Sequence, residues 1–128
     1  YAKELMRKLG IIEIADNDIS EVSGGQLQRA CICRSMINKP KMIFADEPTG
    51  ALNSASSKDV LDIFTELHKS GQTIVMVTHD LKTALRGNRV LFLRDGKVEG
   101  DYRMPDFGKD NLKERRDRLS QFLEMMGW

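Results

Sequence analysis

Two short apolar segments that flank an amphipathic one constrain the fold of this chain most strongly. Residues 42–45 read Met-Ile-Phe-Ala, and residues 73–78 form a second run rich in β-branched side chains. Such runs, apolar without alternation, are typical of strands buried on both faces of a parallel sheet. Residues 54–69 between them carry apolar side chains at helical spacing, and Gly71 follows as a helix stop. Strand, helix and strand in this order predict parallel strands joined by a right-handed crossover.

The flanking segments complete an α/β domain. We expect a helical region over about 1–38, a core over about 41–87, and a C-terminal hairpin and helix over about 88–128. Asp95-Gly96 is a strong hairpin-turn signal. The remaining expected elements are a helix over 1–9, a short helix or loop over 11–22, a helix over 26–38 capped by Ser23, a brief helix over 79–85, strands over 90–94 and 97–99, a loop over 100–108 and a helix over 109–126.

Composition excludes several functional classes. Twenty basic and nineteen acidic residues give a net charge of +1, so no overall field attracts nucleic acid. No apolar run approaches the roughly 20 residues that span a bilayer. Cys31 and Cys33 lie on opposite sides of the predicted helix and cannot easily bridge or share a metal. We therefore expect reduced, mostly buried thiols in a cytosolic protein.

Polar residues follow both predicted strands, at the carboxyl edge where parallel sheets carry their chemistry. Asp46 and Glu47 end the first strand, and because strand neighbours face opposite ways, they can serve different tasks. One carboxylate can meet Mg²⁺ through water and the other can orient or deprotonate a water molecule. His79, at the end of the second strand, can bond a phosphate oxygen. The alternatives are a helix-capping acid and a merely satisfied histidine.

Ser23, Gly24, Gly25 and Gln26 stand at the start of a predicted helix. A capping serine and two glycines leave backbone N–H groups sterically open, and the helix dipole adds about half a positive charge there. The combination suits phosphate oxygens. Taken alone, the tetrad is better explained as an ordinary glycine-rich helix cap.

These motifs together resemble the nucleotide-binding domain of ABC transporter ATPases in order and spacing. Residues 22–26 are similar to the LSGGQ signature with Val22 in place of Leu, and residues 42–47 to Walker B with its catalytic glutamate. Residues 50–53 resemble the D-loop and His79 the H-loop histidine. The sequence from Glu47 to Leu52 most resembles that of the branch of macrolide, antimicrobial-peptide and lipoprotein exporters. The implied fold is an incomplete P-loop NTPase-type three-layer domain with parallel strands plus a C-terminal hairpin and helix.

The resemblance also implies residue roles. Glu47 would polarise the attacking water, Asp46 would hold Mg²⁺ through water, and His79 would contact the γ-phosphate of ATP. Ser23, Gly24 and Gly25 would contact the γ-phosphate of a nucleotide bound by a second ATPase subunit. Gln26 completes the nucleotide-binding set. The D-loop would comprise Ala51, Leu52 and Asn53, where Asn53 replaces the usual Asp and puts coupling between the two sites in doubt.

The implied protein is a cytoplasmic ATPase on the inner face of the cell membrane that powers export through transmembrane permease subunits. Two alternatives remain open: an ABC ATPase that moves no solute, and an interaction module without a P-loop. Long heptad arms, tandem cassettes or a basic stripe would favour the former, and none is visible. Uncovered sheet edges also lead us to expect non-native self-association of the fragment.

A P-loop is missing from these residues. The pattern requires Gly, four residues, then Gly-Lys-Ser/Thr. The only Gly-Lys pairs, at 96–97 and 108–109, are followed by Val98 and Asp110. Because phosphoryl transfer relies almost entirely on positioning and electrostatics, a cassette without this cradle lacks the main requirement for turnover.

We therefore predict that residues 1–128 alone hydrolyse no ATP and bind it only weakly. Isothermal titration calorimetry with Mg·ATP tests this, and a dissociation constant in the micromolar range would contradict it.

Overall fold

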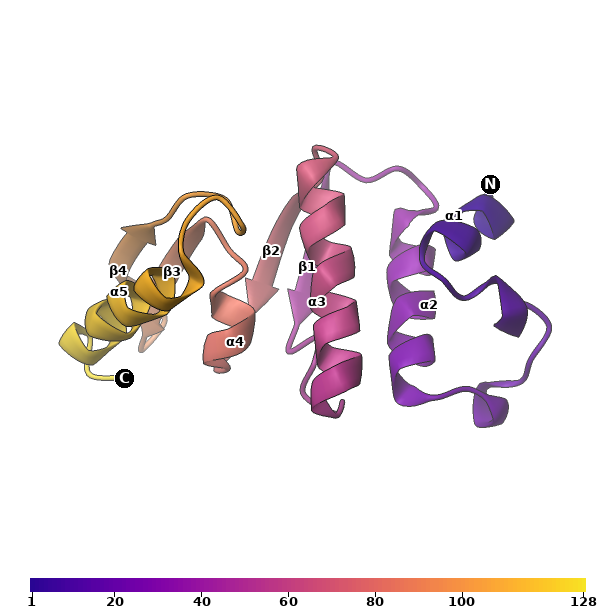
Figure 1. Cartoon of the computed structure of the whole chain (residues 1–128), viewed down its shortest axis with the longest axis horizontal. Helices are drawn as coiled ribbons and strands as arrows, with labels where there is room; N and C mark the ends of the chain where they lie inside the picture. Colours follow the sequence, from indigo (N-terminus) through magenta and orange to yellow (C-terminus); the bar gives the residue numbers. More distant parts are fainter. The chain divides into compact units, whose positions relative to one another are not determined.

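The computed structural model describes all residues, 1–128, as two compact units, Tyr1–Thr78 and His79–Trp128. Figure 1 labels the helices and strands of both. None of the helices combines the length and apolarity that crossing a membrane requires.

Unit 1 contains the predicted strand–helix–strand core. β1 and β2 pair in parallel, with Met42 opposite Thr73 and Asp46 opposite Val77. This pairing confirms the parallel arrangement, and helix and strand positions match the expected ones within a few residues. In chain order the elements are α1 (Ala2–Lys8), 3-10 turns at Ile12–Ile14 and Ile19–Glu21, α2 (Gly24–Met36), β1 (Met42–Asp46), α3 (Ser54–Lys69) and β2 (Thr73–Val77).

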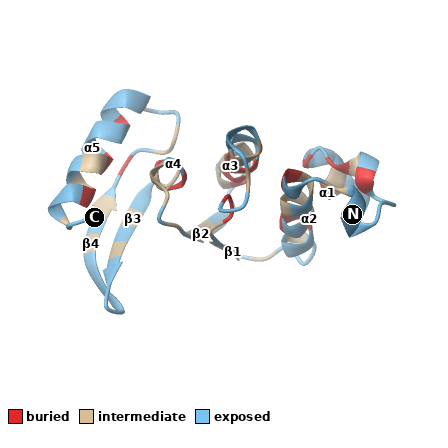
Figure 2. Cartoon of the chain, turned by 90° about the horizontal axis from the view of Figure 1, so that it is seen from below, coloured by how far each residue is buried: buried red, intermediate tan, exposed pale blue.

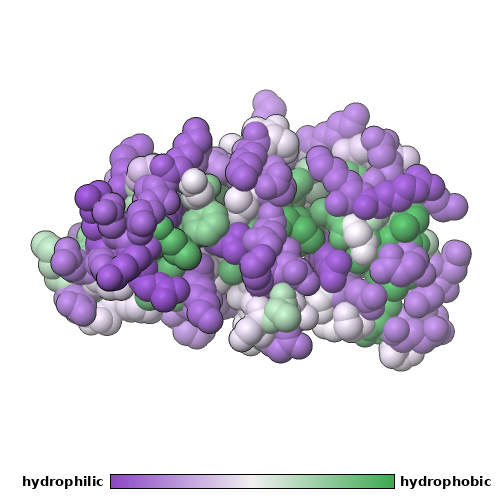
Figure 3. Space-filling model, in the orientation of Figure 1, coloured by the Kyte–Doolittle hydropathy of each residue, from purple (hydrophilic) through white to green (hydrophobic).

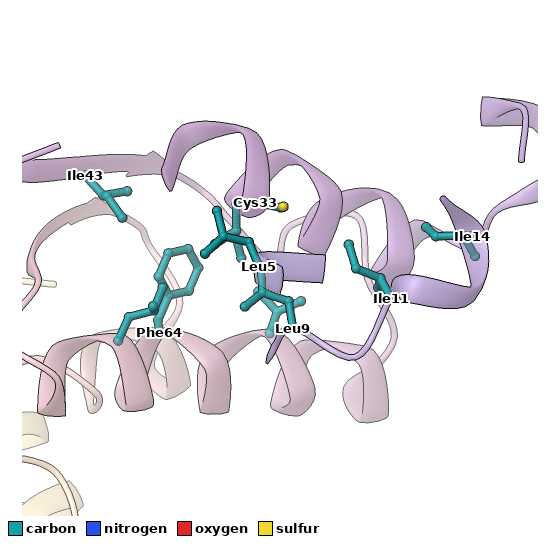
Figure 4. Close-up of a cluster of buried hydrophobic side chains, with 10 residues drawn as sticks. Leu5, Leu9, Ile11, Ile14, Cys33, Ile43 and Phe64 are labelled. Carbon is teal, nitrogen blue, oxygen red and sulfur yellow. The ribbon is translucent and has the colours of Figure 1, made fainter. Parts of the chain in front are cut away.

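The core of unit 1 lies between α1, α2, α3 and one face of the strands. Figure 4 shows Leu5 from α1, Leu9 just after it, Cys33 from α2, Ile43 from β1 and Phe64 from α3 converging in it. The predicted apolar face of α3 is buried at Val60, Leu61, Phe64 and Leu67. Burial of this stripe, worth about 1.5–3 kcal/mol for each large side chain, holds the crossover helix on the strands.

The opposite face of the two strands is exposed, which contradicts the expectation that both faces would be buried. Phe44 is 75% exposed and Val77 57%, while Ile43 is only 5% exposed. Figure 2 shows helix α3 over one side of β1 and β2, and no element of unit 1 covers the other. The apolar runs were read correctly as strands, but the layer that would cover their second face does not come from unit 1.

The start of α3 is set by Asn53. Its side-chain oxygen accepts a hydrogen bond from the Ser56 backbone N–H at 2.9 Å, and its backbone is extended as an N-cap requires. Asn53 therefore has a structural role in addition to its predicted place in the D-loop.

The two cysteines differ in environment. Cys33 is buried and burial raises the pKa of its thiol, whereas Cys31 is exposed. Both are free thiols, as expected, but the expected burial holds only for Cys33.

Unit 2 consists of a short helix, a hairpin and a longer helix: α4 (Leu81–Ala84), β3 (Arg89–Arg94), β4 (Lys97–Arg103) and α5 (Leu112–Met125). β3 and β4 pair antiparallel around Asp95-Gly96, whose φ angles of 50° and 74° are those of a type I′ turn. The expected loop over 100–108 is wrong for its first four residues, because β4 continues to Arg103. The last helix begins at Leu112 rather than Lys109, because Asn111 accepts bonds from the Lys113 and Glu114 N–H groups.

One face of the hairpin packs on α5 at close range. The Tyr102 and Phe122 rings stack with centroids 5.1 Å apart. A Cβ on Gly100 would lie 2.7 Å from both the Met126 sulfur and the Phe122 ring, so any other residue at this strand position would force these side chains to shift. At the hairpin ends, the Arg89 guanidinium hydrogen-bonds Asp101, which lowers the pKa of that carboxyl.

Figure 3 shows one face of the molecule in space-filling form, and polar and charged side chains cover most of that face.

Arg115 is a buried charge on α5. Basic residues of an amphipathic helix ordinarily face solvent, yet the Arg115 side chain is 1% exposed. The guanidinium donates to the carbonyls of Leu85, Gly87 and Pro105 and to the Asp110 carboxylate. A buried charge is tolerated only when it is paired and hydrogen-bonded, and here each of the three guanidinium nitrogens donates to at least one acceptor.

We predict that Arg115→Met destabilises unit 2 by about 3–5 kcal/mol, because it leaves a half-buried carboxylate and three carbonyls without their donor. Urea unfolding followed by fluorescence of Trp128, the only tryptophan and a residue of unit 2, measures the loss. Arg116→Met, which changes the exposed neighbour, is the matched control and should shift stability by less than about 0.5 kcal/mol. Equal effects of both changes would contradict the role of Arg115.

We also predict that Asn53→Ala lowers the free energy of unfolding by about 1 kcal/mol through loss of the α3 cap. Asn53→Asp keeps an acceptor there and adds a charge that suits the helix N-terminus, so it should be neutral or stabilising. Chemical denaturation followed by circular dichroism compares the two. If Asn53→Asp lowered the free energy of unfolding as much as Asn53→Ala, the effect could not be ascribed to loss of the α3 cap.

Candidate functional site

The two acidic residues predicted for catalysis lie where β1 ends. Asp46 is the last strand residue and is exposed, so its carboxylate can meet a hydrated ion. Glu47 lies beyond the strand, is half-buried, and has a φ of 46°. A left-handed conformation costs a residue other than glycine about 1–2 kcal/mol. The side chains of the pair are therefore separated by this backbone turn and not by the strand alternation that we expected.

Hydrogen bonds hold Glu47 in its strained conformation. Its backbone N–H donates to the Val77 carbonyl at 2.7 Å, and the Gly50 N–H donates to the Glu47 carbonyl at 3.1 Å. The Thr78 hydroxyl donates to Glu47 Oε2 at 3.2 Å. Sequence reasoning missed Thr78, which stood only as the last residue of an apolar run. Its contact with Glu47 joins residues 31 positions apart and leaves no local pattern.

Ser23 caps α2 as predicted. Its hydroxyl oxygen accepts from the Gln26 N–H at 3.1 Å, and the Gln26 side-chain oxygen accepts from the Ser23 N–H at 2.9 Å. This reciprocal pair is a capping box. The side-chain oxygen of Gln26, predicted as a nucleotide-binding residue, therefore bonds within the chain. The N–H groups of Gly24 and Gly25, in the first turn, have no acceptor within the helix.

The signature glycines contact the predicted D-loop region. A Cβ on Gly24 would lie 3.2 Å from the Leu52 side chain, and one on Gly25 would lie 3.2 Å from the Ser56 side chain. The starts of α2 and α3 therefore lie side by side in unit 1. Ala51 and Asn53, the other two predicted D-loop residues, are exposed beside them.

His79 is the first residue of unit 2 and is exposed. The next residue, Asp80, caps α4 through the N–H groups of Lys82 and Thr83 and accepts from the Thr83 hydroxyl at 2.9 Å. The acids, the signature residues and the D-loop residues all belong to unit 1, and His79 belongs to the other unit.

These residues are chemically suited to a magnesium nucleotide. The capped N-terminus of α2 offers N–H donors to phosphate oxygens, and Asp46 offers an exposed carboxylate to a hydrated cation. No group of three or more His, Cys, Asp and Glu side chains could hold a metal ion directly.

Comparison with known proteins identifies the family. A family model described as ABC transporter matches residues 1–50. The macrolide export ATP-binding/permease protein MacB of Neisseria meningitidis is 42% identical over 120 residues, which are 93% of this chain and 19% of that protein. The uncharacterized ABC transporter ATP-binding protein YvrO of Bacillus subtilis is 44% identical over 102 residues, 80% of this chain and 44% of that protein. The chain thus spans less than half the length of either relative.

The fold agrees with a solved structure. A dimeric structure of a post-hydrolysis state of the ATP-binding cassette MJ0796, bound to ADP and Pi, matches with a TM-score of 0.63 and 36% identity. The match covers 83% of this chain and 44% of that cassette. The P-loop NTPase-type α/β fold is therefore confirmed. The chain belongs to the ATP-binding cassette transporter family, in the branch that contains the MacB export proteins.

Proposed function

We propose that residues 1–128 form the signature-bearing and Walker B-bearing part of a cassette that binds and hydrolyses ATP to power membrane export. The observation that carries this proposal is that unit 1 has both a capped, glycine-bearing helix start and an acidic pair at the carboxyl end of a parallel strand. The P-loop comes from a segment outside these residues, and without it the chain is inactive.

Each residue has a distinct task in this proposal. Glu47 orients the attacking water and accepts its proton, while Asp46 holds the hydrated magnesium ion, which supplies charge neutralisation at the phosphates. His79 bonds the γ-phosphate. Because both acids lie at one strand end, they serve the same nucleotide.

The N-terminus of α2 serves a different nucleotide. Ser23, Gly24 and Gly25 contact the γ-phosphate of ATP held by a second subunit, with the Gln26 side chain bracing the helix start from within. Two cassettes therefore close around two nucleotides. The dimeric cassette bound to ADP and Pi supports this arrangement by analogy. The close approach of Gly24 to the Leu52 side chain gives a physical route between helix α2 and the D-loop, where Asn53 carries no charge.

Export is the proposed use of the hydrolysis energy. The MacB relative is by name an ATP-binding/permease protein for macrolide export. We propose that this chain works in the same way, on the inner face of the membrane, with a second ATPase subunit and transmembrane permease segments as partners. A peptide, drug or lipoprotein is the proposed cargo class, and nucleic acid is not a partner.

The test is Glu47→Gln in the full-length protein. We expect it to abolish ATP turnover while ATP-dependent dimerisation persists, because the amide keeps the size of the side chain but cannot accept the proton of the water. Phosphate release and size-exclusion chromatography with light scattering measure the two properties.

Glu66→Gln is the matched control, since Glu66 is exposed on α3 and pairs only with Lys69. It should leave turnover unchanged. Undiminished hydrolysis in Glu47→Gln would refute the role of Glu47.

A further inference from the structure

Two consecutive residues, Val77 and Thr78, hold the backbone and the carboxylate of Glu47. Its backbone N–H donates to the Val77 carbonyl at 2.7 Å, and its carboxylate oxygen Oε2 accepts from the Thr78 hydroxyl at 3.2 Å. The parallel register explains why both contacts come from the same place. Asp46 pairs with Val77, so Glu47 and Thr78, which follow them in the chain, lie at the same edge of the strand pair.

Geometry limits what the Thr78 hydroxyl can do. Thr78 is half-buried and β-branched, so few χ1 rotamers are accessible and the hydroxyl direction is restricted. A hydroxyl at neutral pH is a donor to a carboxylate and not a base. A carboxylate has about four acceptor positions, and Thr78 uses one of them. The contact therefore restricts the orientation of the Glu47 carboxylate.

A water-orienting carboxylate benefits from such a constraint. Glu has three side-chain torsions, and a displaced general base loses rate steeply, with about 1 Å costing up to a hundredfold. The left-handed φ of 46° at Glu47 and the Gly50 N–H bond to its carbonyl already fix the backbone. What the backbone leaves undetermined is the direction of the carboxylate, and Thr78 contacts that group.

We propose that Thr78 is a positioning residue for Glu47, setting the orientation in which the carboxylate meets the attacking water. This inference rests on the proposed function of Glu47. It assigns Thr78 no contact with nucleotide and no proton transfer of its own.

The experiment compares Thr78→Val, which removes the hydroxyl at nearly constant shape, with Thr78→Ser, which keeps it. In the full-length protein we expect Thr78→Val to lower kcat at least about tenfold with KM for ATP within about twofold. Thr78→Ser should retain kcat within about threefold. Thr73→Val, the same change at the exposed start of β2, is the matched control and should leave kcat unchanged.

A second measurement is independent of turnover. Three-bond couplings by NMR in residues 1–128 should report one dominant Glu47 side-chain rotamer in the unaltered chain, in Thr78→Ser and in Thr73→Val. Rotamer averaging is expected in Thr78→Val. Averaged couplings in the unaltered chain, or unchanged couplings in Thr78→Val, would overturn the inference.

The outcomes also separate this inference from the proposed function. If Glu47→Gln retains turnover, the function assigned to Glu47 fails. If Glu47→Gln is inactive but Thr78→Val keeps the original kcat, only the role of Thr78 fails. Thr78→Val added to Glu47→Gln should cause no further loss of residual turnover, and an additional loss would show that Thr78 acts through something other than Glu47.

Discussion

Backbone pairing between β1 and β2 determines where the charged residues of unit 1 lie. The ladder runs in register from Met42 to Asp46, and the hydrogen bond from Glu47 to Val77 extends it by one residue. A carboxylate in the apolar core would be costly, and neither acid lies there: Asp46, the last residue of β1, is exposed, and Glu47 follows the strand end. The left-handed conformation of Glu47 turns the chain at that point, and the backbone bonds on either side of Glu47 offset its strain.

The connection between the strands has a second effect, on the helix starts. Helix α3 must cross back over the strands, and its buried stripe from Val60 to Leu67 fixes how it lies on them. Its capped start then comes beside the start of α2, where Leu52 and Ser56 meet the two signature glycines. The same crossover therefore places both the acidic pair and the neighbour of the signature motif.

Local patterns predicted most of the fold, because each depends on near neighbours in the chain. The helix stripe of α3, the Ser23 cap and the Asp95-Gly96 turn were all visible in the sequence and are confirmed. The exposure of one face of β1 was not visible in the sequence, because an apolar run does not reveal whether the layer that covers it lies in the same unit. The early start assigned to the last helix came from overlooking Asn111 as a cap.

The candidate site was predictable in its motifs but not in its contacts. Thr78 meets Glu47 across 31 positions, and Arg115 meets Leu85 across 30. Threonine in a strand and arginine in an amphipathic helix have ordinary local explanations, so composition and periodicity give no signal of either role. Only the parallel register and the packing of α5 bring these partners together.

The signature glycines show why a motif can be recognised before its physical basis is known. From the sequence, the absence of side chains at Gly24 and Gly25 indicated access for phosphate oxygens. In the folded chain the same absence admits Leu52 and Ser56, with about 3.2 Å to where a Cβ would stand. A methyl group at Gly24 would press on Leu52 before any nucleotide arrives. A loss of activity on substitution of Gly24 would therefore have an internal packing cause as well as the nucleotide contact that we propose, and both act through the start of α2.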